Sequence, residues 1–600
     1  MADAVTACTY KPCTACTESC FICPQMGEEF KKFAVRNPHL VQYVVSWTSK
    51  SPLGPPKFVT KLTREMGYAK KYNYIYPVGD PIFIHVYKDS GYSQGIYHPI
   101  EPVLPPDKKY LLNEVEEFIA SLVDEEILEE MKSKKKEEVL SKLLDEVVEV
   151  TDKPTNTKSG GNSSRRRWSL FGRNKKKSRK IIVDAETYAR LKYEFLREKV
   201  GLGVLEAFIR DPYIEDISCD GVGPIFVEHK VFHSLRSTVE FKDDESLNAF
   251  IIKLTERIGK PVRPRRPIVD ATLPDGSRLN VVFGKDISRK GSNFTIRKHT
   301  KIPLSITELI KFGTLDARIA AYLWMLLESK MSIFICGETA SGKTTTLNAI
   351  TVFIRPTAKI VSIEETAEVV LPHPNWVSEV TRHGEDEKSS IDLYDLLKAA
   401  LRQRPDYIIV GEIRGREGYV AFQAMQTGHP VLATFHAANM ERLIQRLSGK
   451  PIEIPPAYLD NLNVVVFQNM VVDPRTGRVD RRVISVDEVI GYDAAEGTYN
   501  YIDIFTWNPQ KDKHEFRGLG NSYLLEYKIA PRRGLAGRDI RKIYDELEMR
   551  AKILEKMVKY GIFDYYNVWK VISKIYFMPV EDALRRIDKI CQKVLKNLSC

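Results

Sequence analysis

Four short apolar runs in the second half of the chain have the pattern of strands that are buried on both faces. Polar or glycine residues follow each run, and the stretches between them are long enough for helices. Such runs are typical of a parallel sheet whose two faces are both covered. The carboxyl ends of parallel strands meet at one edge of a sheet, where ligands bind. The runs are Ser332–Cys336, Lys359–Ile363, Pro405–Val410 and Pro430–His436.

A glycine-rich loop follows the first of these runs. Residues 337–344 match the pattern G-x-x-x-x-G-K-[ST], and the next residues can continue as a helix. Backbone N–H groups of such a loop gather around an anion at the helix N-terminus. The loop therefore predicts ATP binding, with Lys343 reaching the β- and γ-phosphates and the Thr344 hydroxyl helping to hold Mg²⁺. The predicted nucleotide-binding residues are Gly337, Glu338, Thr339, Ala340, Ser341, Gly342, Lys343, Thr344 and Thr345.

Polar side chains mark the ends of the other three runs. Glu364, Glu365 and Glu368 follow the second run, Glu412 follows the third, and His436 ends the fourth. One of the three glutamates can orient or deprotonate an attacking water. Glu412 can engage Mg²⁺ directly or through water, and His436 can hydrogen-bond the terminal phosphate. Taken singly, each residue is also compatible with a surface turn or a core position.

The first half of the chain has the patterns of α+β domains. Aromatic and β-branched stretches predict strands, and Lys108–Val150 predicts one long amphipathic helix. A Pro-Asp-Gly turn separates two later strands. Arg278 and Arg297 lie near strand or turn ends of this region, where most arginines are solvated. The other predicted elements are strands at 72–76, 81–87, 214–217, 224–227 and 294–298, and helices at 185–197 and 246–257.

Length and composition place the chain among multidomain globular proteins. Its 600 residues are too many for one core and predict three or four domains. The sequence is 43% hydrophobic and 28% charged, and no apolar run approaches the roughly 18 residues of a membrane helix. We therefore expect a cytoplasmic protein. The net charge is +11, and nine basic residues without an acidic one lie between Arg165 and Lys180.

Five of the nine cysteines lie within the first 23 residues. Cys13-x-x-Cys16 and Cys20-x-x-Cys23 each have the spacing of a tetrahedral metal site. The two pairs are much closer together than the pairs of a zinc ribbon. Two interpretations stay open, namely a segment that binds zinc or an iron–sulfur cluster and a disordered tail with reduced thiols.

The motifs GETASGKT, IEETAE, YIIVGEIR and TGH…TFH together resemble the secretion ATPase superfamily. Members of that family drive type II and type IV secretion, pilus assembly and archaeal flagellum assembly, and the motifs are their Walker A loop, Asp box, Walker B and His box. The stretches DPYIEDISCDG, LPDGSR and FTIRK resemble the second N-terminal domain of the family, and the tyrosine-rich segment resembles archaeal members most. Glu365 stands where the Asp box usually has Asp, which keeps the charge. The first 57 residues match nothing in the family.

This resemblance implies a ring, usually a hexamer, with ATP at domain or subunit borders. Carried over by position, Glu368 would activate water, Glu412 would serve Mg²⁺, and His436 would lie near the γ-phosphate. Arg278 and Arg297 match arginines that approach the phosphates from the N-terminal domain, where a guanidinium stabilises the charge that develops during phosphoryl transfer. The implied partners are copies of the same chain and a polytopic membrane platform protein.

The expected fold class is α/β, with a RecA-like P-loop ATPase domain, α+β N-terminal domains and a mixed α/β C-terminal region. We expect six parts along the chain. They are a Cys-rich segment at 1–57, an α+β domain at 58–150, a flexible basic linker at 151–180, a second α+β domain at 181–302, the ATPase domain at 303–510, and a mostly helical region at 511–600.

The expected function is a Mg²⁺-dependent ATPase motor, recruited to the inner face of the cell membrane, that powers filament assembly or protein secretion. A DNA-translocating motor of the conjugation type shares the motifs but needs basic residues lining the ring, whereas the charge excess lies in one segment. We therefore expect that segment to bind an anionic membrane surface rather than nucleic acid, with a solvated spacer as the alternative. A nucleotide-gated scaffold with little turnover is the other alternative, although Glu368 and Glu412 are both present.

Overall fold

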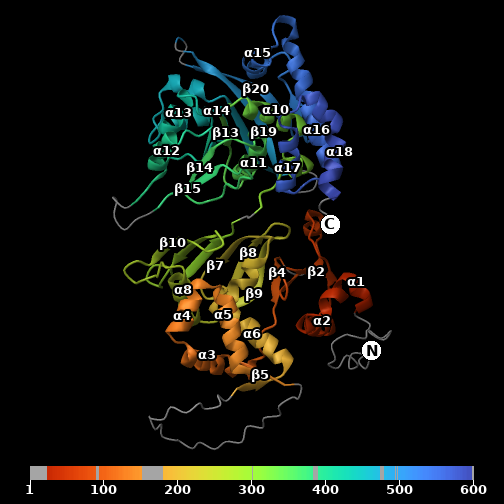
Figure 1. Cartoon of the computed structure of the whole chain (residues 1–600), viewed down its shortest axis with the longest axis vertical. Coiled ribbons are helices and arrows are strands. Elements are labelled where there is room, and N and C mark those ends of the chain that lie inside the picture. The colour runs from red at the N-terminus through yellow and green to blue at the C-terminus, as the bar shows by residue number, and fades with distance from the viewer. Residues whose placement is uncertain are drawn as a thin grey trace, which may run out of the picture. The chain divides into compact units, whose positions relative to one another are not determined.

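The computed structural model describes residues 23–89, 93–151, 180–299, 302–382, 390–472, 479–493, 495 and 498–596. The chain forms two compact units, residues 1–299 and residues 300–600, and each unit has its own sheet and its own hydrophobic core (Figure 1). Among the described helices, none has both the length and the apolar character that a membrane crossing requires.

A ten-stranded sheet organises the first unit. Most neighbouring strands pair antiparallel, but β4 pairs parallel with β9, which joins the tyrosine-rich strands to the later ones. The strands of the two predicted N-terminal domains therefore belong to one sheet. In sheet order they are β1 (Lys57–Phe58), β2 (Tyr72–Pro77), β3 (Phe83–Lys88), β4 (Gly95–Ile100), β9 (His233–Phe241), β8 (Gly223–His229), β7 (Ile214–Cys219), β12 (Asn293–Arg297), β11 (Arg278–Val282) and β10 (Ile268–Thr272).

Helices of the first unit form two smaller cores. Phe30 and Leu40, from two helices within the segment predicted as residues 1–57, pack with Phe83 of β3. Leu143 and Leu191 belong to a second core, which contains helices from both sides of residues 152–179. A short parallel pair of strands closes this second core. The elements of these two cores are α1 (Cys23–Ala34), α2 (Pro38–Lys50), α3 (Tyr110–Leu122), α4 (Glu125–Ser133), α5 (Lys136–Val147), β5 (Val148–Val150), β6 (Ile181–Val183) and α6 (Ala185–Lys199). Helices α7 (Glu206–Arg210) and α8 (Asp244–Arg257) pack instead in the core of the ten-stranded sheet.

The prediction of one long helix over Lys108–Val150 is wrong, because this stretch forms α3, α4 and α5 followed by β5. The Asp124 side chain accepts a hydrogen bond from the backbone N–H of Ile127, 3.0 Å away, and so begins a new helix. An aspartate in this position favours a helix N-terminus over a helix interior. The strands and helices predicted for the rest of the first unit are confirmed, with ends that differ by a few residues.

Two predicted features lie outside the described residues. The basic segment is one of them, since only its last residue, Lys180, is described. The metal-binding cysteines are the other. Cys13, Cys16 and Cys20 are not described, and Cys23 is described only as the first residue of α1.

A nine-stranded sheet organises the second unit. The four predicted apolar runs form β13, β14, β16 and β17, and these strands pair parallel with one another, as expected. A further group of strands continues the sheet antiparallel beyond β18. In sheet order the strands are β15 (Trp376–Val380), β14 (Ile360–Glu364), β16 (Tyr407–Glu412), β17 (Val431–Phe435), β13 (Ile333–Cys336), β18 (Val464–Val472), β19 (Val479–Asp493), β20 (Thr498–Asn508) and β21 (Lys513–Phe516).

Helices cover both faces of this sheet, and the α/β fold class is therefore confirmed. Alternate residues of β13 show the two faces, because Ile333 and Ile335 belong to one core while Phe334 and Cys336 belong to the other. The helices are α9 (Ile306–Lys311), α10 (Ala317–Glu328), α11 (Lys343–Ile350), α12 (Leu393–Arg402), α13 (Glu417–Gln426), α14 (Met440–Ser448), α15 (Ala530–Arg532), α16 (Lys542–Lys559), α17 (Tyr565–Ile575) and α18 (Val580–Lys596).

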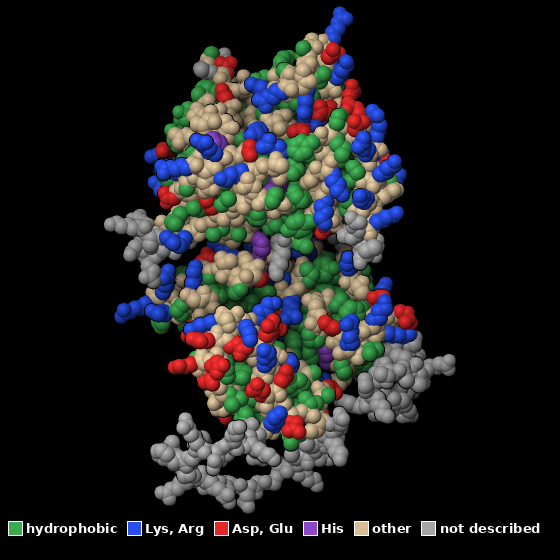
Figure 2. All heavy atoms as spheres, in the orientation of Figure 1, with side chains coloured by type: hydrophobic (Ala, Val, Ile, Leu, Met, Phe, Trp, Pro, Cys, Tyr) green, Lys and Arg blue, Asp and Glu red, His purple; other side chains and the backbone are tan. Residues whose placement is uncertain are grey.

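Basic side chains gather on the C-terminal helices as well as in the predicted linker. Figure 2 shows Lys and Arg side chains on the edge of the second unit where Figure 1 places α16 and α18. The apolar side of α18 is buried, and its outer side exposes Arg585, Arg586, Lys589 and Lys593. Subtracting the nine basic residues of Arg165–Lys180 from the net charge of +11 leaves only +2, so these four side chains form a local basic face in a nearly neutral remainder, which bears on the choice of partner below.

Candidate functional site

The glycine-rich loop joins the carboxyl end of β13 to the N-terminus of α11, as the sequence predicted. β13 is buried along its length between β17 and β18. Gly342 directly precedes α11 and has a φ angle of 91°, in the left-handed region that glycine adopts readily. The first N–H groups of a helix have no partner within the helix, so the loop and α11 present donors to an anion.

The ammonium of Lys343 and the hydroxyl of Ser341 are both suited to binding a phosphate. The ammonium of Lys343 donates to the backbone carbonyls of Gly337, at 3.1 Å, and Glu338, at 2.9 Å. Burial lowers the pKa of Lys343, so an anionic ligand would stabilise its charged form. Among the described residues, the buried Ser341 Oγ has no hydrogen-bond partner. A buried hydroxyl without a partner is the kind of group that a ligand satisfies.

Glu412 lies at the end of β16 and contacts two cationic or titratable side chains. Its Oε2 accepts a hydrogen bond of 2.5 Å from Arg414, and its Oε1 lies 3.0 Å from Nε2 of His436. Burial lowers the pKa of His436, and the charge of Lys343 lowers it further, so the imidazole is neutral near pH 7. The loop and the ends of two strands therefore share one electrostatic environment.

Gly411 allows the ends of β14 and β16 to approach each other. A Cβ atom added at Gly411 would lie 2.9 Å from Cγ of Glu364, which is closer than real Cβ contacts. The register between β16 and β17 also shifts between Val410 and Glu412. Gly411 therefore leaves room for the side chain of Glu364 beside the end of β16.

The three glutamates after β14 differ in their environments. Glu364 is buried, and its Oε1 accepts hydrogen bonds of 2.9 Å from the N–H groups of Glu368 and Val369. Its Oε2 is also buried and has no hydrogen-bond partner among the described residues. Burial raises the pKa of Glu364 to about 7. Glu365 and Glu368 are exposed, and Glu365 lies 3.4 Å from Arg414.

Thr344 and Glu412 fit the predicted Mg²⁺ site in their chemistry. Thr344 is half-buried in the first turn of α11, and Oε1 of Glu412 is buried next to Nε2 of His436. Both are oxygen donors, and Mg²⁺ is usually held by one or two protein oxygens together with phosphate oxygens and water. Within the described ranges, no group of three or more His, Cys, Asp or Glu side chains forms a metal site alone.

Arg278 and Arg297 lie in the first unit, directly opposite each other on β11 and β12. Arg278 forms a two-pronged ion pair with Asp270, at 2.7 and 3.2 Å. Arg297 is exposed and lies opposite Asp216 on β7. Two like charges in one cross-strand pair destabilise a sheet unless anions compensate them.

Gln468 and Arg481 contact the loop, but the sequence did not predict them as site residues. Gln468 Nε2 donates to the carbonyl of Ser341 at 2.7 Å, and Arg481 Nε donates to the carbonyl of Ala340 at 2.9 Å. A weak signal for Gln468 was present, because it is the first polar residue after the apolar run Val464–Phe467. No comparable signal marks Arg481.

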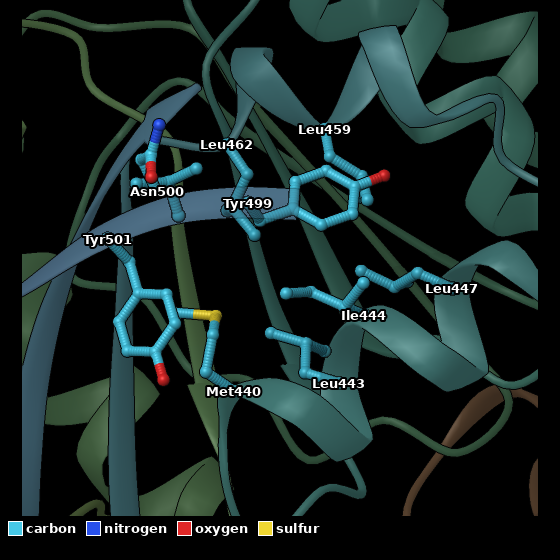
Figure 3. Close-up of a pocket in the computed structure, with 10 residues that line it drawn as sticks. Met440, Leu443, Ile444, Leu447, Leu459, Leu462, Tyr499, Asn500 and Tyr501 are labelled. Atoms are coloured by element: carbon cyan, nitrogen blue, oxygen red, sulfur yellow. The ribbon is translucent and has the colours of Figure 1, made fainter. Parts of the chain in front are cut away.

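A small hollow elsewhere in the second unit is not part of this site. Figure 3 shows it between α14 and β20, and its volume is about 10 Å³. Its walls are mostly apolar and carry no charged group. The residues around it are Met440, Leu443, Ile444, Leu447, Leu459, Leu462, Val489, Tyr499, Asn500 and Tyr501.

Comparison with known proteins supports one family. The family model described as "Type II/IV secretion system protein" matches residues 198–490. The chain is 46% identical over 564 residues to the uncharacterized protein MJ0900 of Methanocaldococcus jannaschii, covering 92% of this chain and 98% of that protein. It is 26% identical over 259 residues to protein VirB11 of Rhizobium radiobacter, covering 39% and 75%. The pilus retraction motor PilT with bound ADP matches with 19% identity, 65% and 95% coverage, and a TM-score of 0.34.

Replacing Glu364 with Gln tests the buried carboxylate. The folded-state pKa of about 7 lies above the usual 4.5, so the protonated group favours folding, and this stability is lost as the pH rises through 7. From pH 5 to 8, without nucleotide and in EDTA, wild-type protein should lose up to about 3 kcal/mol, and Glu364→Gln should lose less. Urea denaturation measures this, with the exposed Glu365→Gln as control. Identical pH profiles for Glu364→Gln and wild type would contradict the assignment.

Proposed function

The chain belongs to the type II/IV secretion ATPase family, and from this we propose that it hydrolyses ATP with Mg²⁺ to drive filament assembly or protein secretion through a membrane platform. One observation carries the proposal. A phosphate loop with Lys343 and Thr344 lies beside the strand-end residues Glu412 and His436, in one electrostatic environment. That arrangement suits phosphoryl transfer, because catalysis there rests on positioning and charge stabilisation.

The loop binds the phosphates of ATP, and Lys343 moves from the carbonyls of Gly337 and Glu338 to the β- and γ-phosphate oxygens. Thr344 and Glu412 would hold Mg²⁺, Glu412 directly or through water. When bound, Mg²⁺ neutralises charge that develops on the phosphate oxygens. His436, neutral and next to Glu412, donates a hydrogen bond to the terminal phosphate.

Glu364 suits the role of proton acceptor for the attacking water. A general base works best when its pKa lies near the operating pH, and burial raises that of Glu364 to about 7. Its free Oε2 offers an acceptor. Glu368, which the sequence named for this role, is exposed and remains the alternative. Its backbone carbonyl accepts a hydrogen bond from Asn348 of α11, so the Glu368 segment is attached to the phosphate-loop helix.

The working form in this proposal is a hexameric ring at the inner face of the cell membrane. Filament assembly of the type IV pilus or archaeal flagellum kind is the preferred output, with a polytopic platform protein as partner and the basic segment Arg165–Lys180 on anionic lipid. DNA translocation is the second candidate, and the exposed basic side of α18 favours it. Stimulation of ATP hydrolysis by double-stranded DNA, but not by anionic vesicles, would select DNA translocation.

ATP hydrolysis itself is the first test. Purified full-length protein should hydrolyse ATP with Mg²⁺, and Lys343→Ala should abolish turnover because the charge that holds the β- and γ-phosphates is lost. Glu412→Gln should bind nucleotide but hydrolyse it at least about 100-fold more slowly. Exposed Lys589→Ala serves as control and should match wild type. Equal turnover of wild type in EDTA and in Mg²⁺ would contradict the proposal, and very slow turnover with tight binding would favour the nucleotide-gated scaffold.

The paired arginines of the first unit give a second test. We propose that Arg297 and Arg278 contribute positive charge to the phosphates in the assembled ring. Arg297→Ala should lower kcat about 10³-fold or more while sparing ATP affinity, because its interaction strengthens in the transition state. Arg278→Ala should act in the same direction, and exposed Arg289→Ala of the same unit should not. If neither Arg297→Ala nor Arg278→Ala slows hydrolysis, both arginines are surface residues without a role in turnover.

A further inference from the structure

The register of the central strands places Gln468 directly beside the phosphate loop. Cys336, the last residue of β13, pairs with Phe467 of β18, so the next residue of each strand lies at the same edge. A Cβ atom added at Gly337 would lie 2.0 Å from the backbone oxygen of Gln468. The approach of β18 thus requires glycine at the first position of the loop.

The side chain of Gln468 spans the loop from its end to the helix that follows. Its Nε2 donates to the carbonyl of Ser341 at 2.7 Å, and its Oε1 accepts from Oγ1 of Thr346 at 2.6 Å. The carbonyl of Ser341 accepts only, so it fixes the orientation of the amide. Gln468 and Thr346 are both buried, which leaves water little access to these bonds. A Cβ atom at Gly342 would lie 2.9 Å from Nε2 of Gln468, so the second motif glycine also makes room for this side chain.

Arg481 holds the neighbouring peptide unit from the next strand. Arg481 is opposite Met470 in the β18–β19 pair, and its Nε donates to the carbonyl of Ala340 at 2.9 Å. The carbonyls of Ala340 and Ser341 are therefore each held by one side chain. Ala340 has a φ angle of 62°, an uncommon conformation for a residue with a side chain, which needs such support.

Because each peptide unit is planar, these two contacts also fix the direction in which the N–H groups of Ser341 and Gly342 point. In a planar trans peptide unit, the C=O and N–H groups point in opposite directions. When Arg481 holds the Ala340 carbonyl and Gln468 holds the Ser341 carbonyl, the N–H groups of Ser341 and Gly342 point away from β18 and β19. Among the described residues, the Ser341 N–H donates one long hydrogen bond, 3.4 Å, to the carbonyl of Glu338, which an anion in the loop can replace. Both N–H groups thus remain available to an anion in the loop.

We propose that Gln468 and Arg481 are positioning residues that hold the phosphate loop in its nucleotide-binding conformation. This inference rests on the proposed nucleotide site and adds two residues that lie more than 120 positions beyond the loop's motif. Neither side chain needs to touch the nucleotide. They act through the peptide units of residues 340–342, so they contribute equally to binding of the substrate and of the transition state.

Nucleotide affinity, measured on full-length protein with Mg²⁺ and a fluorescent ADP derivative, tests this inference. Gln468→Met keeps the length of the side chain but removes both polar atoms, and Arg481→Gln removes the guanidinium. Gln468→Met should raise the Kd for ADP and the KM for ATP by about 5- to 100-fold, the effect of leaving a buried hydrogen-bonding group without a partner. Arg481→Gln should raise both by about 2- to 10-fold, because Arg481 and Ala340 are exposed and water partly replaces their hydrogen bond. At saturating ATP, kcat should stay within about twofold of wild type, as expected for uniform binding. Arg481→Lys should restore part of the affinity, since a lysine also donates to a carbonyl.

Two exposed residues of α18 provide matched controls, Gln592→Met and Arg586→Gln, and both should bind ADP like wild type. Arg481 is exposed, so its variants carry the test even if Gln468→Met lowers the melting temperature. Wild-type affinity in both Gln468→Met and Arg481→Gln would overturn the inference, and so would a fall in kcat with unchanged KM. Wild-type protein that fails to bind ADP or hydrolyse ATP would contradict the proposed function instead.

Discussion

The site depends on the burial of β13 between β17 and β18. This strand is apolar on both faces and contributes to both cores of the second unit. A shift in its register would therefore expose apolar side chains or cause steric clashes on both faces. Its pairing sets the neighbours of the phosphate loop. Cys336 pairs with Phe435 on one side and with Phe467 on the other, so His436 and Gln468 emerge on either side of Gly337. The positions of the phosphate loop, His436 and Gln468 at this sheet edge therefore follow from the packing of β13 in the core.

Several polar groups at this edge are held at a cost in stability. Ser341 Oγ and Glu364 Oε2 are buried without hydrogen bonds among the described residues, and the buried Glu412 Oε1 lies 3.0 Å from Nε2 of His436. An unsatisfied buried polar atom costs about 1–3 kcal/mol, and the raised pKa of Glu364 expresses the same cost for a charge. Natural proteins break the rule of full satisfaction mostly at functional sites. Ser341 lies in the phosphate loop, and Glu364 and Glu412 lie at the ends of β14 and β16 in the same sheet, so these groups belong to the edge where we propose that the nucleotide binds.

The sequence was most informative where a local rule determines the structure. The apolar runs gave the parallel strands, and the glycine pattern gave the loop, because burial and helix N-termini have strong local signals. The interruption at Asp124 was missed because amphipathic periodicity continues across the cap. Gln468 and Arg481 could not be assigned from spacing, since their role comes from strand register and not from sequence distance. The difference between Glu364 and Glu368 likewise depends on burial, which alternates within one short turn.

The parts of the chain differ in how far their functions follow from the structure. The second unit contains the phosphate loop, the strand-end carboxylates and the histidine, whereas the two arginines belong to the first unit. A structure of the full-length protein with Mg²⁺, ADP and beryllium fluoride would show whether the phosphate loop holds the nucleotide. We expect phosphate oxygens in the loop, with Nζ of Lys343 bonded to them instead of to the carbonyls of Gly337 and Glu338. Nucleotide bound away from this loop, or Lys343 still bonded to those two carbonyls, would contradict this expectation.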